Sequence, residues 1–161
     1  MFPETVLYLA EQVLERCRAS GLKIVTAESC TGGLIASCLT AIEGSSDVVD
    51  RGYVTYSNQA KNQMLGVPSI LFDTVGAVSE EVACAMAAGA ITHSDGDISI
   101  SVTGIAGPSG GSNDKPVGLV HMAVGLKGRQ PLHERHVFLG DRTAVRQATV
   151  EQSLLFINNI L

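Results

Sequence analysis

The feature that most constrains this fold is the alternation of helix-like and strand-like segments through the first hundred residues. Apolar residues recur at helical spacing over residues 3–20, and a short apolar strand is expected at 23–27. The order then repeats, with helices expected at 33–42, 58–65 and 79–92 and strands at 52–56 and 97–103. Strands separated by helices can pair in parallel, so this order predicts βαβ units with helices on both faces of a sheet.

The last third of the chain follows a different order. Strands are expected at residues 117–126 and 133–139 with no helix before or between them, and a final helix starts near Asp141 and runs through Ile157. A parallel pair needs a crossover, so at least one of these strands should run antiparallel. The prediction is an α/β fold with a mixed, mostly parallel sheet of about five strands, in one domain over residues 1–161.

Charge and composition disfavour several classes of function. Sixteen acidic residues against eleven Lys and Arg give a net charge of −5, and aromatic residues make up 4%. Proteins that bind nucleic-acid backbones usually show a basic face, so direct nucleic-acid binding is not expected. The four cysteines form no CxxC pair, so no metal and no disulfide framework is expected.

Hydropathy bears on where the protein works and with what it associates. No apolar run approaches a membrane span, and the N-terminal pattern is acidic and amphipathic, unlike a signal peptide. A cytoplasmic protein with no membrane contact is expected. The apolar content, 45%, is high for this size and favours a homo-oligomer.

Three polar segments follow three of the expected strands: AESCTGG (27–33), TYSNQAK (55–61) and TGIAGPSGG (103–111). Ligands of open α/β sheets bind outside the carboxyl ends of the strands. If the three strands are parallel neighbours, these segments converge on one pocket. This convergence is the strongest inference that the residues alone support.

The first segment offers several groups for such a pocket. Gly32 and Gly33 open a helix, so their bare backbone can hold a phosphate or carboxylate, or can simply form the turn. Glu28 can orient a ligand or tie down the turn. Ser29 and Thr31 can react with or bind a substrate, or cap the helix.

The second segment suggests nucleophilic catalysis. A desolvated Lys61 can lose its proton near neutral pH and act as general base for a Ser hydroxyl, although a helix Lys is more often a solvated surface charge. Tyr56 lies five residues before it. The GSS turn at residues 44–46 supplies a candidate hydroxyl in Ser46, although turns are also rich in Ser for structural reasons.

Two further candidates lie later in the chain. Thr103 and Gly104, at the end of a strand, can direct backbone amides at a developing oxyanion. Arg142, in the first turn of the last helix, can clamp an anion or can be an ordinary surface Arg.

Taken together, the motifs TAESCTGG, RGYVTYSNQAK, VGAVSEEV, SVTGIAGPSGG, KPVGLV and GDR resemble the C-terminal domain family of the competence/damage-inducible protein CinA, in its stand-alone nicotinamide-nucleotide amidohydrolase form. The resemblance covers about residues 5–155. It implies a three-layer α/β/α sandwich. It also implies hydrolysis of the carboxamide of nicotinamide mononucleotide (NMN) to nicotinate mononucleotide and ammonia in pyridine nucleotide salvage, with no metal or organic cofactor.

On this resemblance we assign Ser46 as nucleophile and Lys61 as its base, with Tyr56 hydrogen-bonded to the pair and Thr103 and Gly104 near the oxyanion. Ser29 is the alternative nucleophile, and a directly activated water is a third route. The remaining candidates would bind substrate, with Arg142 near the phosphate: Glu28, Thr31, Gly32, Gly33 and Arg142.

A second class of function stays open at this point. Fold and family do not guarantee activity, so the chain can instead be a non-catalytic module that binds a nucleotide or a protein partner in competence or the DNA-damage response. The two hypotheses differ in whether Ser46, Tyr56, Lys61 and Thr103 meet in one pocket. A binding module would not need a desolvated Lys beside a hydroxyl.

Overall fold

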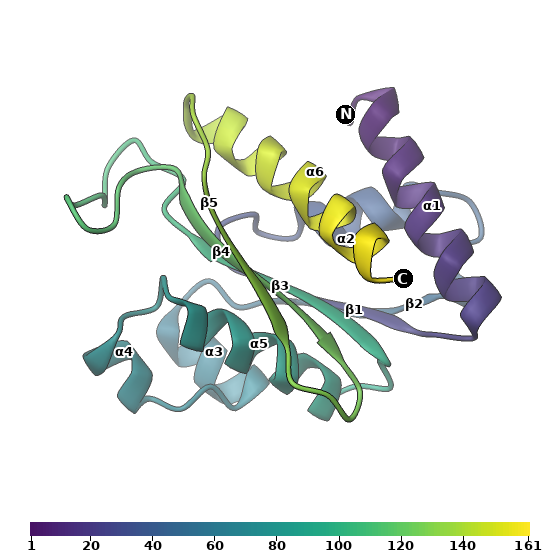
Figure 1. The fold of residues 1–161 in the computed structure, drawn as a ribbon, viewed down its shortest axis with the longest axis horizontal. Helices are drawn as coiled ribbons and strands as arrows, with labels where there is room; N and C mark the ends of the chain where they lie inside the picture. Colours follow the sequence, from purple (N-terminus) through teal and green to yellow (C-terminus); the bar gives the residue numbers. More distant parts are fainter.

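The computed structural model describes residues 1–161, and a five-stranded sheet runs through the middle of the molecule (Figure 1). The strands lie in the order β2-β1-β3-β4-β5. The first three run parallel, β4 is antiparallel to β3, and β5 is antiparallel to β4. Their bounds are β1 (Ile24–Glu28), β2 (Val49–Val54), β3 (Ile98–Gly104), β4 (Leu119–Leu126) and β5 (Leu132–Val137).

Six α-helices cover the two faces of this sheet. On one face lie α1 (Glu4–Ser20), α2 (Leu34–Thr40) and α6 (Arg142–Ile160), which contact one another. On the other lie α3 (Asn58–Leu65), α4 (Ile70–Thr74) and α5 (Glu80–Thr92), and α5 packs on β1, β3 and β4 (Figure 1). The predicted α/β/α sandwich with a mixed sheet, four of whose five strands point the same way, is confirmed.

The arrangement of the strands decides where a site can form. All five residues of β1 are buried, and β1 lies between β2 and β3. Its last residue, Glu28, pairs with Val54 of β2 and Val102 of β3. The carboxyl ends of the three parallel strands therefore meet at one edge of the sheet. The segments that follow these strands lie at that edge, as expected from the sequence.

Caps fix the start of the helices that matter most here. The side chain of Ser57 accepts a hydrogen bond from the Ala60 N–H and caps α3. Ser79 caps α5 in the same way, and Asp141 caps α6. Side-chain oxygens at these positions satisfy N–H groups that have no partner inside the helix.

The boundaries of some elements differ from the prediction. Strand β2 lies at 49–54 instead of 52–56, and β5 ends two residues early, at 137. A short 3₁₀ turn, η1 (Ser45–Asp47), and helix α4 were not predicted. Helix α4 has five residues and buries none of them. It therefore leaves no amphipathic pattern in the sequence.

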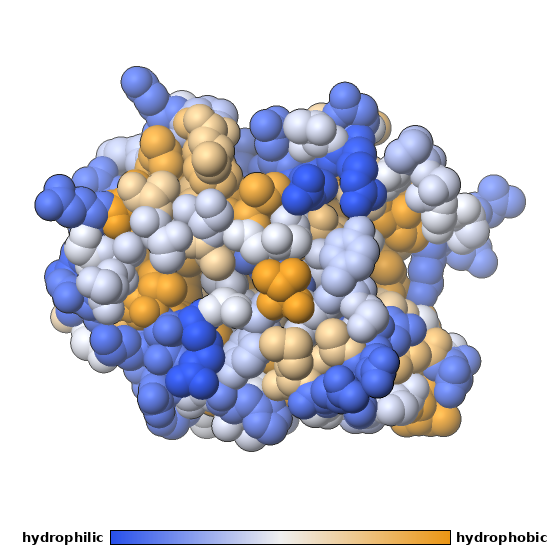
Figure 2. Space-filling view, turned by 180° about the vertical axis from the view of Figure 1, so that it is seen from behind, coloured by the Kyte–Doolittle hydropathy of each residue, from blue (hydrophilic) through white to orange (hydrophobic).

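The surface mixes polar and apolar side chains. Figure 2 shows apolar side chains in several separate patches among polar ones on the face behind that of Figure 1. No helix of the structure combines the length and the apolar character needed to cross a membrane. The homo-oligomer stays a prediction.

The packing of α5 against α3 depends on one glycine. A methyl group added at Gly89 of α5 would lie 1.9 Å from the carbonyl oxygen of Leu65, at the end of α3. We expect Gly89→Ala to lower the free energy of unfolding by about 2–3 kcal/mol, although Ala is the better helix former by about 1 kcal/mol. Urea unfolding measures the effect.

Ala88 provides the matched control, because it is the exposed neighbour of Gly89 in the same helix. Ala88→Gly should cost about 1 kcal/mol from helix propensity alone. A Gly89→Ala chain as stable as the unaltered one would contradict the close approach of α3 and α5.

Candidate active site

The first part of the site is the turn that joins β1 to α2. The N–H of Ser29 donates to the Val102 carbonyl of β3, and the Gly32 N–H donates to the Ser29 carbonyl at 3.1 Å. Gly32 and Gly33 follow with φ of 61° and 99°, the left-handed region that favours glycine. These bonds hold Ser29 at the carboxyl end of the strand.

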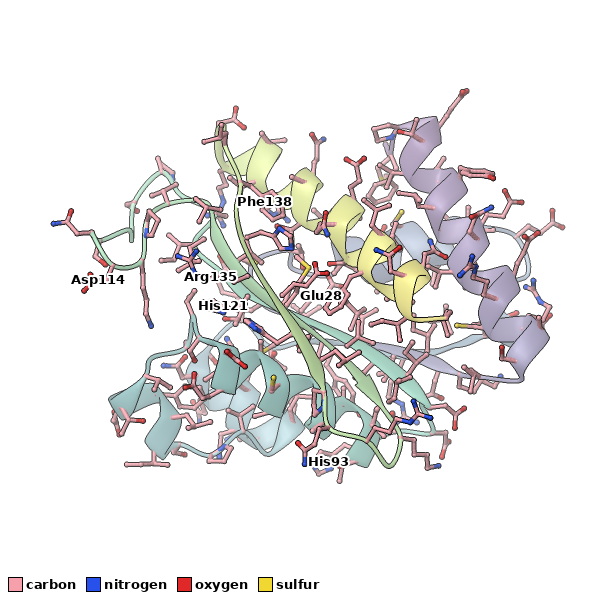
Figure 3. The ribbon with its side chains drawn as sticks, viewed as in Figure 1. Glu28, His93, Asp114, His121, Arg135 and Phe138 are labelled. Carbon is pink, nitrogen blue, oxygen red and sulfur yellow. The ribbon has the colours of Figure 1, made fainter.

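Glu28 supports this turn from inside the molecule. Its carboxylate is fully buried and accepts hydrogen bonds from the Thr31 hydroxyl at 2.6 Å and from the N–H groups of Gly33, Ile35 and Ala36 at 2.9–3.0 Å. Figure 3 shows Glu28 in the interior of the molecule, beside the sheet. Both carboxylate oxygens are thus occupied at the start of α2. Of the two roles left open for Glu28, the structure favours tying down the turn.

Lys61 comes from α3 on the other side of the sheet and ends beside Ser29. Its side chain is 1% exposed, and Nζ lies 2.9 Å from Ser29 Oγ. Nζ also lies 2.9 Å from the Thr55 carbonyl oxygen and 3.4 Å from the Tyr56 carbonyl oxygen. A Lys and a Ser hydroxyl are therefore in direct contact in a buried place.

This environment suits a general base. Burial lowers the pKa of Lys61 below its ordinary value of 10.5, because an ammonium group loses its hydration there. Once the ammonium is deprotonated, two hydrogens and one lone pair remain on Nζ. The carbonyls of Thr55 and Tyr56 can accept the two hydrogens, which leaves the lone pair to receive the proton of Ser29.

A cavity of about 210 Å³ opens in front of the Ser29–Lys61 pair. Six residues predicted for the site line it: Ser29, Tyr56, Lys61, Thr103, Gly104 and Arg142. Four predicted binding residues do not line it: Glu28, Thr31, Gly32 and Gly33. Glu28 and Thr31 are fully buried. The convergence expected from the strand order brings together the Tyr, the Lys, the Thr and one of the two candidate Ser residues.

Tyr56 and Arg142 form one side of the cavity. Arg142 donates from Nη2 to the Tyr56 hydroxyl and from Nη1 to the Gly107 carbonyl, both at 2.9 Å. Tyr56 therefore meets Lys61 through its backbone carbonyl, while its phenol contacts Arg142. Both side chains are exposed, so a ligand that enters the cavity can reach them.

The end of β3 forms the floor. Thr103 is 1% exposed and donates its hydroxyl to the Ala77 carbonyl. The Val102 carbonyl faces β1, where it accepts the Ser29 N–H. Peptide groups alternate along a strand, so the N–H of Gly104 faces the same side, beyond the point where pairing with β1 ends. Gly104 is thus placed to donate into the cavity.

Ser46 lies elsewhere, and the expected Ser46–Lys61 pair does not form in this structure. Ser46 is exposed in η1, which precedes β2, whereas Lys61 lies beyond the far end of β2. Six residues of strand separate the two places by about 20 Å, at roughly 3.3 Å per residue. The hydroxyl beside Lys61 is that of Ser29, the alternative nucleophile.

Other residues of the cavity were not singled out from the sequence. Asn58, Ala77 and Val78 line it, and Arg146 of α6 contacts the turn after Ser29. Arg146 follows Arg142 by four residues and so lies on the same face of α6, a spacing that could have indicated it. Cys30 also lines the cavity, but burial raises the pKa of its thiol to about 12, which disfavours a thiolate nucleophile.

No three His, Cys, Asp or Glu side chains come together in the chain in a way that could hold a metal ion. The cavity itself presents hydroxyl, amine, guanidinium and backbone groups. These are the groups that acyl transfer uses.

The model of one protein family, the CinA C-terminal domain, matches residues 7–161. The chain belongs to the CinA C-terminal domain family. The nicotinamide-nucleotide amidohydrolase PncC of Escherichia coli K12 is 45% identical over 154 residues, which cover 96% of this chain and 93% of that protein. The protein of the same name from Pseudomonas putida is 48% identical over 151 residues, 94% of each chain.

Two other similar proteins are a longer relative and one whose crystal structure has been solved. The chain spans only 36% of a CinA-like protein from Syntrophobacter fumaroxidans, to which it is 46% identical. The crystal structure of the competence/damage inducible protein CihA from Agrobacterium tumefaciens has a TM-score of 0.95 and 48% identity, covering 99% of this chain and 98% of that one.

The lowered pKa of Lys61 makes stability depend on pH. Between the folded-state value and the unfolded value near 10.5, the unfolded chain binds more protons than the folded one. In this window the free energy of unfolding should rise with pH, by about 1.4 kcal/mol per pH unit at most. We expect Lys61→Met to lack this rise when urea unfolding is followed from pH 7 to pH 10.

Lys127, exposed in the β4–β5 turn, provides the control. Lys127→Met should follow the pH dependence of the unaltered chain. A constant difference in stability between Lys61→Met and the unaltered chain over the whole range would show that burial does not shift the pKa of Lys61.

Proposed function

We propose that this chain hydrolyses the carboxamide of nicotinamide mononucleotide, giving nicotinate mononucleotide and ammonia, with Ser29 as nucleophile and Lys61 as its base. The observation that carries the proposal is the 2.9 Å contact between Lys61 Nζ and Ser29 Oγ in a buried place at the mouth of a cavity. The two PncC relatives, similar over nearly their whole length, support the choice of substrate.

The reaction follows from the placement of these groups. Neutral Lys61 takes the proton of Ser29 while Oγ attacks the carboxamide carbon, and the carbonyl oxygen becomes an oxyanion. The Lys61 ammonium then gives its proton to the amide nitrogen. The C–N bond breaks, ammonia leaves, and an ester joins the nicotinoyl group to Ser29. Water, deprotonated by Lys61, cleaves this ester and restores the Ser29 hydroxyl.

The cavity alone is too small for the whole substrate. Its volume is about 210 Å³, and a neighbouring hollow of about 430 Å³ at the start of α6 shares Ala106 and Arg142 with it. We propose that the carboxamide end enters the smaller space and the phosphate lies in the larger one. Arg142, which stands between them, then pairs with the phosphate.

The other predicted roles divide between binding and support. Gly104 is proposed to donate its N–H to the oxyanion, Thr103 to hold the floor of the cavity, and Tyr56 to orient Arg142. Glu28, Thr31, Gly32 and Gly33 are proposed to act through the turn that carries Ser29. Catalysis by a water activated directly by Lys61 would not need Ser29, and a non-catalytic module would not need the buried Lys61.

The choice of nucleophile gives the first test. Ammonia release from nicotinamide mononucleotide should fall by at least about 10³-fold in Ser29→Ala, because the acyl-enzyme route is lost. Ser46→Ala should retain the rate of the unaltered chain, since Ser46 lies at the opposite edge of the sheet. A chelator added to each assay keeps adventitious metal out of the comparison.

Other outcomes of these rate measurements would favour one of the two alternatives, a directly activated water or a non-catalytic module. An active Ser29→Ala with an inactive Lys61→Ala would favour water activated by Lys61. No ammonia release by the unaltered chain would favour the binding module.

Arg142 gives a second test, which concerns the phosphate. Arg142→Gln should raise KM for nicotinamide mononucleotide by about 10–100-fold, the effect of losing one charged hydrogen-bonded contact of about 1.5–3 kcal/mol. Nicotinamide riboside lacks the phosphate, so its kcat/KM should be nearly the same in Arg142→Gln as in the unaltered chain. An equal loss with both substrates would refute the phosphate role and leave the Ser29–Lys61 reaction standing.

A further inference from the structure

The turn after Ser29 contains two backbone N–H groups that the fold does not use. The turn is closed by the Gly32 N–H on the Ser29 carbonyl, with Cys30 and Thr31 as its two central residues. Neither the N–H of Cys30 nor that of Thr31 donates to another residue. Thr31 is fully buried and Cys30 is 6% exposed. A buried N–H without a partner costs about 1–3 kcal/mol, and of the two only that of Cys30, which lines the cavity, can meet a ligand.

Arg146 holds the same turn from the side of α6. Its Nε donates to the Cys30 carbonyl at 3.2 Å and its Nη2 to the Thr31 carbonyl at 2.9 Å. The N–H of a trans peptide points away from its carbonyl. The bond to the Cys30 carbonyl therefore turns the Thr31 N–H away from Arg146. The bond between Gly32 and Ser29 likewise turns the Cys30 N–H out of the turn.

We propose that Arg146 is a positioning residue that holds the N–H of Cys30 ready for the oxyanion formed when Ser29 attacks an amide. Cys30 lines the cavity, and the N–H after a nucleophile is a common oxyanion donor. The inference rests on the proposed function and adds one donor to that of Gly104. Arg146 itself touches neither substrate nor Ser29 Oγ.

Two supports thus fix the turn through opposite groups. On the α2 side, Glu28 accepts hydrogen bonds from the N–H groups of Gly33, Ile35 and Ala36. On the α6 side, Arg146 donates hydrogen bonds to the carbonyls of Cys30 and Thr31. With both supports in place, the free N–H of Cys30 needs no rearrangement when negative charge develops. Donors fixed in advance contribute most to the rate.

Arg146 can be reached from a second cavity, so the loss of its side chain can be tested by chemical rescue. Arg146 lines a cavity of about 420 Å³ between the start of α1 and the start of α6. A guanidinium ion that enters this cavity can occupy the place of a deleted Arg146 side chain. It would then restore the two hydrogen bonds to the turn.

The experiment measures kcat and KM for nicotinamide mononucleotide in Arg146→Ala, with and without millimolar guanidinium. We expect kcat to fall about 100-fold, the usual effect of losing an oxyanion donor, with KM changed less than about 3-fold, because the oxyanion exists only in the transition state. Guanidinium should raise kcat of the variant at least tenfold. Arg129→Ala, which removes an exposed Arg of the β4–β5 turn, should show neither effect.

Three results would overturn the inference. The first is an unchanged kcat in a folded Arg146→Ala, or a rise in KM alone. The second, if Arg146→Ala does not fold, is an unchanged kcat in Arg146→Lys, which keeps the charge but not the fork of two donors. The third is a fully active Ser29→Ala or an inactive unaltered chain, which would refute the proposed function as well. An inactive Ser29→Ala beside a fully active Arg146→Ala would refute this inference alone.

Discussion

The geometry of the cavity depends most on the burial of the Lys61 amine. This amine contacts the Ser29 hydroxyl after β1 and two backbone carbonyls after β2. An ammonium group taken out of water is destabilised, and the carbonyls of Thr55 and Tyr56 offset only part of that loss. The same loss of hydration makes the amine ready to give up its proton. A Lys that only contributed to stability would keep its charge in solvent, as long side chains usually do. Burial of Lys61 thus lowers its pKa and costs free energy of folding.

The contact between Ser29 and Lys61 persists only if both residues keep their places. Ser29 follows a strand whose two neighbours fix its end, and Lys61 stands on a helix capped by Ser57 and packed against α5 through Gly89. The turn between β1 and α2 is held by a buried carboxylate on one side and a guanidinium on the other. Each reacting group is thus carried by a rigid element or a doubly supported turn, which preserves a distance of 2.9 Å.

The sequence predicted the sheet and the edge that carries the site, because both follow from the order of strands and helices. Ser29 directly follows β1, Tyr56 and Lys61 belong to the segment after β2, and Thr103 and Gly104 end β3. The parallel arrangement brings these residues together. The expected Ser46–Lys61 pair does not form, because Ser46 precedes β2 and Lys61 follows it. A turn that precedes a strand lies at the opposite edge from the segment that follows it, so the GSS turn could have been placed away from Lys61 from the sequence alone.

The supports of the site could not be predicted in the same way, because they act through backbone groups. Glu28 and Arg146 bind N–H and carbonyl groups of a turn whose course no residue pattern specifies. The identity of the side chains shows that an acid and a base are present, but not which peptide groups they meet. The turn has the sequence of an ordinary strand-to-helix connection. Its two N–H groups without a partner become visible only when every other donor of the turn has been assigned one.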